Sequence, residues 1–264
     1  MRIVNTKQER IIRPSTLEYF DYELGPYVGC EHRCVYCYTQ NEPELDWDRE
    51  VGVFPDFRER LIKELDALGP QVIYFGLDTD PYQPIEAEYR HTRQALEELG
   101  KRGFSASILT KSDIFTRDFD LLAAMPESAV GASIAFNEEA CRLLFEKSSK
   151  PTSARLRALA EAKAAGIETY VLISPVMPLI TDVDALIEET RRIADTIWIY
   201  SLEVKGTELR SWRRMERVME EHFPDMLETF REIALSPLHP YWTELDRKLR
   251  ARAARDGLNL DIHL

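Results

Sequence analysis

The sequence has no apolar run that approaches the roughly 20 residues needed to cross a bilayer, so it predicts no membrane-spanning helix. Basic residues are also in the minority: 34 Lys and Arg stand against 46 Asp and Glu, for a formal net charge of −12. Binding to nucleic acid or to an anionic membrane needs clustered cations, so this balance argues against broad attraction to either, although it allows a local basic groove. No apolar stretch follows Arg2, and we therefore expect no export signal.

Cysteine is scarce: the chain of 264 residues has four. Three of them fall within eight residues, Cys30-Glu31-His32-Arg33-Cys34-Val35-Tyr36-Cys37, and Tyr38 follows directly. Three close cysteines leave one unpaired, so a disulfide explains the cluster poorly. Largely unpaired cysteines instead predict a reducing compartment, the cytoplasm.

The C-x3-C-x2-C spacing predicts a metal centre. Three thiolates can hold three irons of a [4Fe–4S] cluster and leave the fourth iron without a protein ligand. A structural zinc site is the alternative, but it needs a fourth ligand. A lone cysteine in a helical pattern, as at Cys141, is more often a small buried residue than a ligand. The residues that offer a fourth zinc ligand are His32, His91, His222, His239 and Cys141.

Short apolar strands alternate with amphipathic helices through most of the chain. This alternation implies right-handed βαβ crossovers and a parallel sheet. With residues 19–24 as a first strand there are about six units, fewer than the eight that close a barrel. The pattern alone fits a partial (β/α) barrel or a doubly wound sheet. The further predicted strands are 71–75, 104–109, 129–136, 168–173 and 196–201, and the predicted helices are 57–68, 87–101, 117–125, 138–146, 152–165 and 182–194.

Both flanks of this alternation have a different character. We predict a core over residues 1–205 and a C-terminal helical extension packed on it over residues 206–264. The interspersed charges of the extension predict a solvated surface. The flanking segments are an extended lead-in at 1–18, an acidic solvated connection at 42–50, charged helices at 208–222 and 242–255, and an edge strand at 258–262.

Polar side chains recur where the predicted strands end. Ligands of parallel α/β proteins gather at the carboxyl ends of strands, so the recurrence predicts a ligand site. Each residue alone is explained equally well as a turn former or a helix cap. The strand-end residues are Asp78, Thr79, Asp80, Tyr82, Gln83, Thr110, Lys111, Ser112, Ser133, Tyr200, Ser201, Glu203 and Lys205.

Three segments together resemble the spore photoproduct lyase-like group of the radical S-adenosylmethionine (radical SAM) superfamily, a group often labelled as DNA repair photolyases. They are residues 29–38, residues 79–86 with the run Thr-Asp-Pro-Tyr-Gln-Pro, and residues 110–112. The resemblance extends over about residues 20–205. It implies an α/β fold, a partial (β/α)6 TIM-type barrel, with the cysteines in the loop after the first strand.

The resemblance also implies two cofactors, a [4Fe–4S] cluster and SAM, and an external electron donor of the flavodoxin or ferredoxin type. Cys30, Cys34 and Cys37 would be the cluster ligands. In the family, the open iron chelates the amino and carboxylate groups of SAM. An electron from the cluster then cleaves SAM to methionine and a 5′-deoxyadenosyl radical.

Five further residues match cofactor-binding positions of the family. Thr79 and Lys111 match polar residues that hold SAM, with Lys111 pairing with the methionyl carboxylate as a point charge. Ser133 would lie near the ribose hydroxyls. Tyr36 and Tyr38 match an aromatic pair that flanks the last cysteine, where Tyr38 would shield the cluster or the adenine.

We therefore expect an enzyme that abstracts hydrogen from a nucleic-acid base or nucleoside, or from a small metabolite or peptide. Asp78, Asp80 and Tyr82 are the predicted catalytic residues, and Gln83, Glu203 and Lys205 also face the substrate in this prediction. Spore photoproduct lyase itself uses a cysteine as hydrogen donor. The position that matches it here is about Leu77, with no cysteine beside it, so we predict that the protein is not a thymine-dimer lyase.

Two alternatives come from other functional classes. One is a non-catalytic protein whose cysteines hold zinc or an electron-relay cluster. The other is a partner-dependent subunit that docks through its C-terminal helices. Trp212, Phe223 and Trp242 of those helices are either part of such a docking surface or part of the core.

Overall fold

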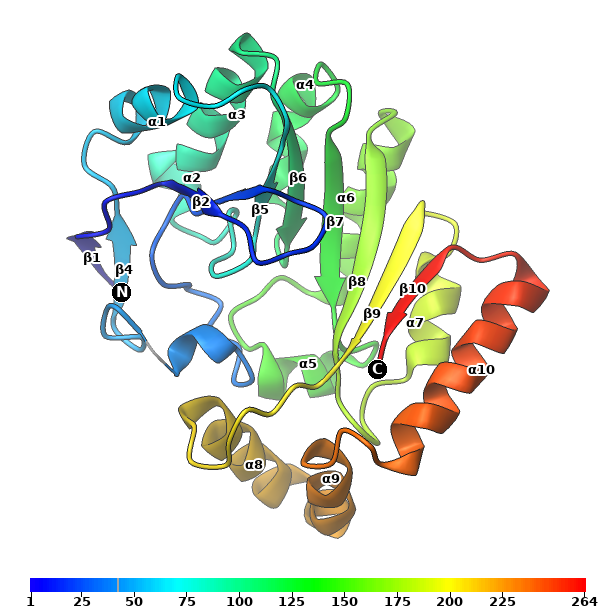
Figure 1. Cartoon of the computed structure of the whole chain (residues 1–264). Helices are drawn as coiled ribbons and strands as arrows, with labels where there is room; N and C mark the ends of the chain where they lie inside the picture. The colour runs from blue at the N-terminus through cyan, green and yellow to red at the C-terminus, as the bar shows by residue number, and fades with distance from the viewer. Residues whose placement is uncertain (42) are drawn as a thin grey trace.

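The fold is centred on one open sheet, seen here in a computed structural model that describes residues 1–41 and 43–264 (Figure 1). The strand order is β10-β9-β8-β7-β6-β5-β3-β2. Neighbours from β3 to β10 are parallel, and only β2 runs antiparallel to its neighbour among the described strands. The strands are β2 (Ile12–Pro14), β3 (Tyr22–Leu24), β5 (Val72–Phe75), β6 (Ser105–Thr110), β7 (Ala129–Ile134), β8 (Glu168–Val176), β9 (Thr196–Ser201) and β10 (Leu260–His263).

The sheet is the predicted partial barrel and does not close, since β10 and β2 form its two edges. Six of its parallel strands, β3 and β5 to β9, are those expected from the sequence. The strand β10 continues the parallel sheet, with Leu260 opposite Ile197. The C-terminal segment therefore contributes a strand to the main sheet as well as helices, while the boundary between residues 205 and 206 stays a prediction.

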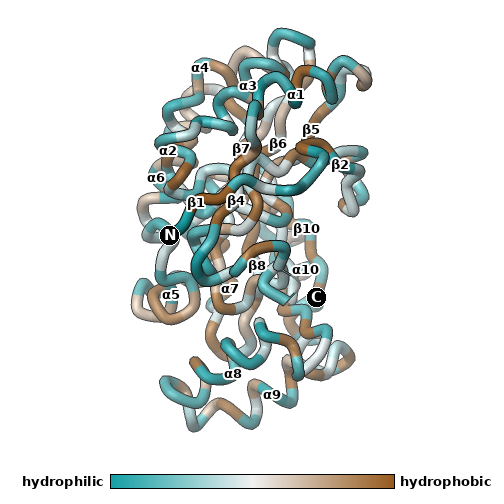
Figure 2. The backbone as a smooth tube through the Cα atoms, turned by 90° about the vertical axis from the view of Figure 1, so that its left-hand side faces the viewer, coloured by the Kyte–Doolittle hydropathy of each residue, from teal (hydrophilic) through white to brown (hydrophobic). Residues whose placement is uncertain are grey.

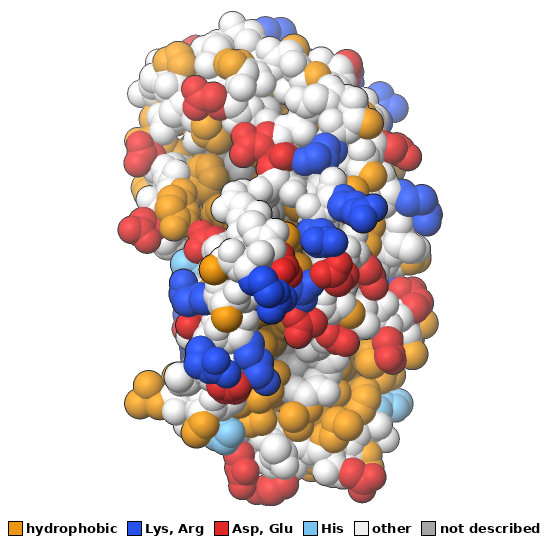
Figure 3. Space-filling view, turned by 90° about the vertical axis from the view of Figure 1, so that its right-hand side faces the viewer, with side chains coloured by type: hydrophobic (Ala, Val, Ile, Leu, Met, Phe, Trp, Pro, Cys, Tyr) orange, Lys and Arg blue, Asp and Glu red, His pale blue; other side chains and the backbone are white. Residues whose placement is uncertain are grey.

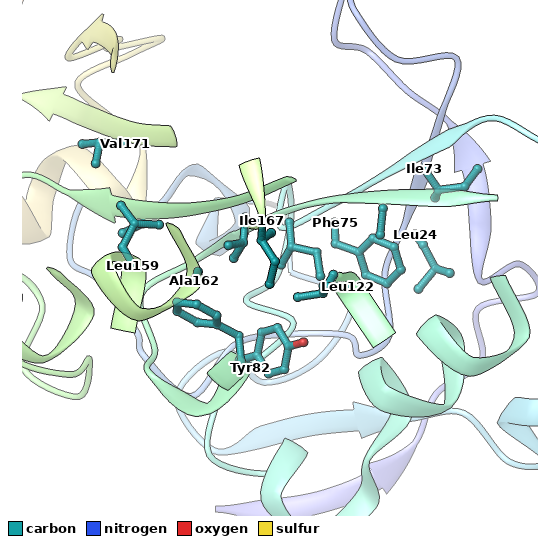
Figure 4. Packing of buried hydrophobic residues seen from close by; sticks show 14 of the residues in the cluster. Leu24, Ile73, Phe75, Tyr82, Leu122, Leu159, Ala162, Ile167 and Val171 are labelled. Atoms are coloured by element: carbon teal, nitrogen blue, oxygen red, sulfur yellow. The ribbon is translucent and has the colours of Figure 1, made fainter. Parts of the chain in front are cut away.

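The two faces of the sheet bury different side chains, because successive residues of a strand point to opposite sides. Ile73 and Phe75 pack on the outer face in the main core, whereas Tyr74 between them belongs to a separate cluster with Leu109 and Tyr170 on the inner face. Figure 4 shows part of the outer core. Burying each such large apolar side chain stabilises the fold by roughly 1.5–3 kcal/mol.

Helices cover the outer face of the sheet (Figure 1). Each presents an apolar stripe to it; in α1 the buried residues are Phe57, Leu61 and Leu65, four residues apart. Hydrophobic residues accordingly follow the central strands, with hydrophilic ones on the outer helices and loops (Figure 2). The helices are α1 (Phe57–Leu65), α2 (Glu86–Tyr89), α3 (His91–Lys101), α4 (Phe119–Leu122), α5 (Glu139–Phe145), α6 (Thr152–Ala164), α7 (Val183–Thr190), α8 (Arg210–His222), α9 (Leu227–Ala234) and α10 (Pro240–Asp256), with 3-10 helices η1 (Tyr38–Gln40), η2 (Ile114–Asp118) and η3 (Pro224–Met226).

The helix predicted over 87–101 is interrupted at Arg90. This residue has a left-handed backbone with φ of 55°, which ends α2 before α3 begins. The N–H of His91, freed by the break, donates to the Tyr27 hydroxyl at 3.2 Å. A tertiary contact that the local pattern does not encode therefore stabilises the break.

The predicted extended lead-in contains two strands. β1 (Arg2–Asn5) pairs in parallel with β4 (Glu50–Val53), and β2 joins the edge of the main sheet. The prediction of a solvated connection over 42–50 is wrong for Trp47, which is 3% exposed, and for Glu50, which begins β4. Residue 42 lies outside the described residues. Strands of three or four residues are too short to give a recognisable period.

Charged side chains cover α10, as predicted. Lys and Arg are interspersed with Asp and Glu on the face seen in Figure 3, and Arg250 pairs with Asp246 at 2.8 Å. Trp212 and Trp242 are 2% and 4% exposed and so belong to the core, not to an open docking surface. In the part of the chain that the structure describes, no helix combines the length and apolar character that crossing a membrane requires.

Candidate active site

A cavity of about 450 Å³ lies at the carboxyl ends of the strands, between the cysteine segment and the β9–α8 connection. It brings together most of the residues that the sequence singled out. Tyr82 and Gln83 do not line it. The predicted residues that do are Cys30, Cys34, Cys37, Tyr36, Tyr38, Asp78, Thr79, Asp80, Thr110, Lys111, Ser133, Tyr200, Ser201, Glu203 and Lys205.

The start of the cysteine segment is anchored by the loop after β5. Gly29 has φ of 77°, and its carbonyl accepts hydrogen bonds from Thr79 Oγ1 at 2.6 Å and Gln83 Nε2 at 3.1 Å. Gln83 Oε1 in turn accepts the Glu31 N–H at 2.8 Å. Gln83 therefore positions the cysteine segment and does not face the cavity.

The end of the segment is held by Gln40, which the sequence did not single out. Its fully buried side chain donates from Nε2 to the carbonyls of Val35 at 2.7 Å and Cys37 at 2.9 Å. The backbone between the last two cysteines is thereby fixed without occupying either thiol. The one available signal was an amide residue three positions after Cys37, which is too common to be diagnostic.

The three thiols form a donor set for a multinuclear centre. Burial raises the pKa of all three thiols, and for Cys30 burial together with the negative charges of Asp80 and Cys37 raises it to about 12. Among the described residues, no three His, Cys, Asp or Glu side chains converge as a single metal ion requires. In a [4Fe–4S] cluster each thiolate binds a different iron and no such convergence is needed. The arrangement thus fits a cluster better than a zinc site.

The alternative zinc ligands have other partners. His32 Nδ1 lies 3.2 Å from the Ser148 carbonyl, and the His91 ring stacks 4.2 Å from that of Phe57. His239 Nδ1 accepts the Tyr241 N–H at 3.2 Å as a cap of α10. The remaining two, His222 and Cys141, do not line the cavity.

Asp80 is a buried junction beneath the cysteine segment. Its carboxylate accepts hydrogen bonds from the Tyr82 N–H at 2.8 Å, Thr110 Oγ1 at 2.6 Å and the Lys111 N–H at 2.6 Å. His32 Nε2 lies 3.2 Å from it. Burial raises the pKa of Asp80, but His32 and these donors outweigh burial and lower it to about 2. A charged Asp80 therefore ties the β5 and β6 loops together, and its catalytic role stays a prediction.

Lys111 brings a buried positive charge to the cavity wall. Its Nζ donates to Ser133 Oγ at 2.8 Å and lies 5.8 Å from the centre of the Tyr36 ring. Burial lowers the pKa of Lys111, but the negative charges of Cys34 and Glu146 outweigh burial and raise it above its ordinary value. An ammonium next to a hydroxyl is suited to bind a carboxylate and a neighbouring polar group.

A buried ion pair holds Tyr36 and Ser133 in place. The Tyr36 hydroxyl donates to Glu146, and Arg155 donates to Glu146 at 2.6 Å and to the Ser133 carbonyl at 2.7 Å. Burial raises the pKa of Glu146, but Arg155 and Lys111 outweigh burial and lower it to about 2. Neither Glu146 nor Arg155 was singled out; an arginine on the buried face of the helix predicted at 152–165 was the available signal.

Asp78 stands at the edge of the cavity with two partners. Its carboxylate accepts Arg13 at 2.7 Å and the Tyr38 hydroxyl at 3.0 Å. The Tyr38 hydroxyl also lies 3.1 Å from the Leu77 carbonyl. Arg13 comes from β2, in the segment predicted to be an extended lead-in without clear periodicity, so its part in the site could not be expected.

Tyr82 lies away from the cavity. Its ring packs among buried hydrophobic side chains on the helix side of the sheet (Figure 4), and its hydroxyl donates to Asp118 at 3.0 Å. The hydrogen bond from the Tyr82 N–H to Asp80 closes a tight turn after Asp80, and the side chain leaves this turn on the outer face. The structure therefore does not place the Tyr82 side chain at the cavity, and its predicted catalytic role stays a prediction.

The floor of the cavity is aromatic and apolar. Tyr74, Trp198 and Tyr200 line it together with Leu109 and Leu172. The rings of Trp198 and Tyr200 are 6.5 Å apart. Such a surface accepts an apolar or planar group and excludes water from it.

Comparison with known proteins places the chain in a family. Residues 24–192 match the family model described as the Radical SAM superfamily. The uncharacterized protein MJ0683 of Methanocaldococcus jannaschii is 30% identical over 232 residues, which cover 86% of each chain. The uncharacterized protein Rv2578c of Mycobacterium tuberculosis is 28% identical over 81% of this chain and 67% of its own. The protein belongs to the radical SAM superfamily.

Solved structures share the fold at low sequence identity. A spore photoproduct lyase variant with bound AdoMet and dinucleoside spore photoproduct has a TM-score of 0.69 and 13% identity, over 98% of this chain and 80% of that one. SuiB of Streptococcus suis, bound to its precursor peptide SuiA, has a TM-score of 0.59 and 11% identity, over 90% of this chain and 47% of that one. The molecules bound in these two structures, a dinucleoside and a peptide, differ in class, so the shared fold does not select a substrate class.

Proposed function

We propose that the protein is a radical SAM enzyme in which Cys30, Cys34 and Cys37 hold a [4Fe–4S] cluster. The observation that most strongly supports this proposal is that the three cysteines, Lys111 and Ser133 line one cavity. When bound, the cluster and SAM supply an electron and a 5′-deoxyadenosyl radical that abstracts hydrogen from a substrate. Membership of the family implies SAM and an iron–sulfur centre.

In this proposal, the residues of the chain bind SAM and hold the cysteine segment in position. Lys111 offers its ammonium to the carboxylate of SAM, and Ser133, which accepts from Lys111, offers its hydroxyl hydrogen. Thr79 lines the same cavity while its own hydroxyl hydrogen is donated to the Gly29 carbonyl. The buried Glu146–Arg155 pair fixes Tyr36, so the backbone between Cys34 and Cys37 is restrained from both sides. The apolar floor at Tyr74 and Trp198 excludes water from the reacting group.

The substrate is presented between the aromatic floor and a polar edge. Asp78 and Tyr38 form this edge near β5, and Glu203 and Lys205 form it after β9. A nucleobase or nucleoside and a small metabolite or peptide both offer a planar or apolar part and a polar edge. Leu77 lines the cavity where a thymine-dimer lyase has its cysteine, which supports a reaction other than dimer cleavage. We further propose an external flavodoxin- or ferredoxin-type electron donor and a cytoplasmic location.

Anaerobic reconstitution with iron and sulfide tests this function. Reduction in the presence of SAM should release 5′-deoxyadenosine and methionine, and Cys34→Ala should abolish both products. Cys141→Ala is the matched control, because Cys141 does not line the cavity and should leave release unchanged. Zinc without iron in the native protein, or equal release from Cys34→Ala, would contradict the proposal.

A further inference from the structure

One end of the cavity has no residue assigned above to the cluster or to SAM. It lies where the segment after the last cysteine meets the first turns of α8, and the Ser211 N–H donates to Asn41 Oδ1 across this junction at 2.9 Å. We call it the α8 end. The residues that line it are Arg33, Asn41, Trp47, Ser211, Trp212 and Met215.

The α8 end has an excess of positive charge. Arg214 donates to both carboxylate oxygens of Asp48, at 2.7 and 2.8 Å, and Arg210 also binds Asp48. Burial raises the pKa of Asp48, but Arg214 and Arg210, with a smaller contribution from Arg33, outweigh burial and lower it. In the described part of the chain, Asp48 is the only carboxylate bonded to Arg210 or Arg214, and Arg33 has none. Three guanidinium groups thus surround one carboxylate in a chain of net charge −12.

The same end has hydrogen-bond donors without acceptors. Trp47 is 3% exposed, and its indole N–H has no acceptor among the described residues; neither has the Nε–H of Arg33. Buried donors are almost always paired in native proteins, so two orphans at one place indicate a missing acceptor. At the start of α8 the N-cap residue Leu209 makes no side-chain hydrogen bond, and Asn41 accepts the Ser211 N–H; a helix N-terminus favours an anion near its remaining N–H groups.

We propose that the α8 end binds a phosphate group carried by the substrate. Its groups are donors and cations, so the ligand must supply acceptors and negative charge. A phosphate monoester carries nearly two negative charges and three acceptor oxygens, which match the two guanidinium groups in excess and the unpaired donors better than a singly charged carboxylate does. This inference rests on the proposed function only in assigning the phosphate to the substrate.

The aromatic floor extends the argument to the rest of the ligand. Trp198 and Tyr200 line the same cavity as Arg33 and Trp47. A ligand with a ring on the floor and a phosphate at the α8 end therefore satisfies both parts at once. An aromatic phosphate monoester, phenyl phosphate, is the minimal probe of this arrangement.

Isothermal titration calorimetry on the reconstituted protein, without reductant, tests the proposal independently of turnover. Phenyl phosphate should bind more tightly than phenol and than phenylacetate. Arg33→Gln and Trp47→Phe should each weaken phenyl phosphate at least about tenfold, the effect of losing a charge-assisted or otherwise unsatisfied buried hydrogen bond, and leave phenol unchanged. Arg49→Gln is the matched control, because Arg49 is exposed, does not line this cavity and should not alter binding.

Three results would overturn the proposal. Phenyl phosphate that binds no better than phenol shows that no phosphate is recognised, and phenylacetate that binds equally well assigns the site to a carboxylate. A loss of SAM affinity in Arg33→Gln, with phenyl phosphate unaffected, assigns the α8 end to SAM. Iron content and melting temperature establish that each variant is folded and loaded, and Arg33→Gln decides the question if Trp47→Phe does not fold. Because no measurement needs SAM cleavage, failure here leaves the proposed function intact.

Discussion

The carboxylate of Asp80 accepts the backbone N–H of Lys111 at 2.6 Å, and this hydrogen bond connects the loop after β5 to the loop after β6. The same Lys111 reaches Ser133 at the end of β7 through its ammonium group. The Asp80 carboxylate also lies 3.2 Å from His32 Nε2, in the cysteine segment. One buried carboxylate therefore connects the cysteine segment to the proposed SAM ligand.

Asp80→Asn should lower both stability and cluster loading. The NH2 group of the asparagine amide would face groups that are themselves hydrogen-bond donors. Removing one partner of a buried charged pair costs about 3–5 kcal/mol. Urea unfolding and iron content after reconstitution measure the two effects. Asp78→Asn is the control, since Asp78 is partly exposed at the cavity edge and should retain iron. A stable, fully loaded Asp80→Asn would show that the junction is not needed.

Lys111→Met should weaken SAM binding at least about tenfold, because a buried ammonium that pairs with a carboxylate contributes about 1.5–3 kcal/mol. Calorimetric titration of the reconstituted protein with SAM measures this loss. Lys205→Met removes an exposed ammonium from the same cavity and should leave SAM affinity unchanged. A larger loss of SAM affinity in Lys205→Met than in Lys111→Met would instead place SAM at the outer rim of the cavity.

Tyr82→Phe should destabilise the protein by about 1–3 kcal/mol, since the hydroxyl donates to the buried Asp118. Release of 5′-deoxyadenosine should stay within about twofold of the native rate, because the ring lies outside the cavity. Urea unfolding measures the change in stability, and a single-turnover assay measures the rate of 5′-deoxyadenosine release. Tyr38→Phe is the comparison variant, because it removes a tyrosine hydroxyl that bonds Asp78 within the cavity. A large loss of 5′-deoxyadenosine release with unchanged stability would support a catalytic role for Tyr82.

Glu98 should make stability pH-dependent in the acid range. Burial raises its pKa, but Lys101, Arg102 and Arg58 outweigh burial and lower it to about 2. Because the folded pKa lies below the unfolded value of about 4.3, ionised Glu98 stabilises the fold above that value, and the contribution is lost as the pH falls towards 2.

The variant Glu98→Gln should therefore be less stable than the native protein at pH 7, with a difference that shrinks as the pH falls from about 4.5 towards 2. Urea unfolding at a series of pH values measures this difference. Glu127→Gln, at an exposed position with no ion pair among the described residues, should give a small difference that does not change with pH. A constant difference for Glu98→Gln would refute the assignment.

The sequence was most informative where a pattern was local. Cys30, Cys34 and Cys37 share one loop, and their spacing alone predicted a metal centre. The strands β5 to β9 were found because each carries a compact apolar run. Polar strand ends predicted the cavity residues Thr79, Lys111 and Ser133, since parallel strands bring their carboxyl ends to one edge.

What the sequence did not reveal depends on contacts between distant segments. Arg13 and Asp78 are 65 residues apart, and Arg214 and Asp48 are 166 residues apart. Neither pairing produces a periodic pattern in the sequence from which it could be predicted. The position of Tyr82 could not be read from its neighbours: Thr79 and Asp80 line the cavity, but a turn of the backbone sends the Tyr82 ring to the other side of the sheet.

The most direct test of the central claim is the EPR spectrum of the reduced, reconstituted protein with and without SAM. Addition of SAM should change the spectrum of the native protein, because a cluster held by Cys30, Cys34 and Cys37 leaves one iron open to a ligand. Lys111→Met should need at least about tenfold more SAM for the same change. A native spectrum that ignores saturating SAM would contradict the account and reduce the cysteine segment to an electron-relay or structural site.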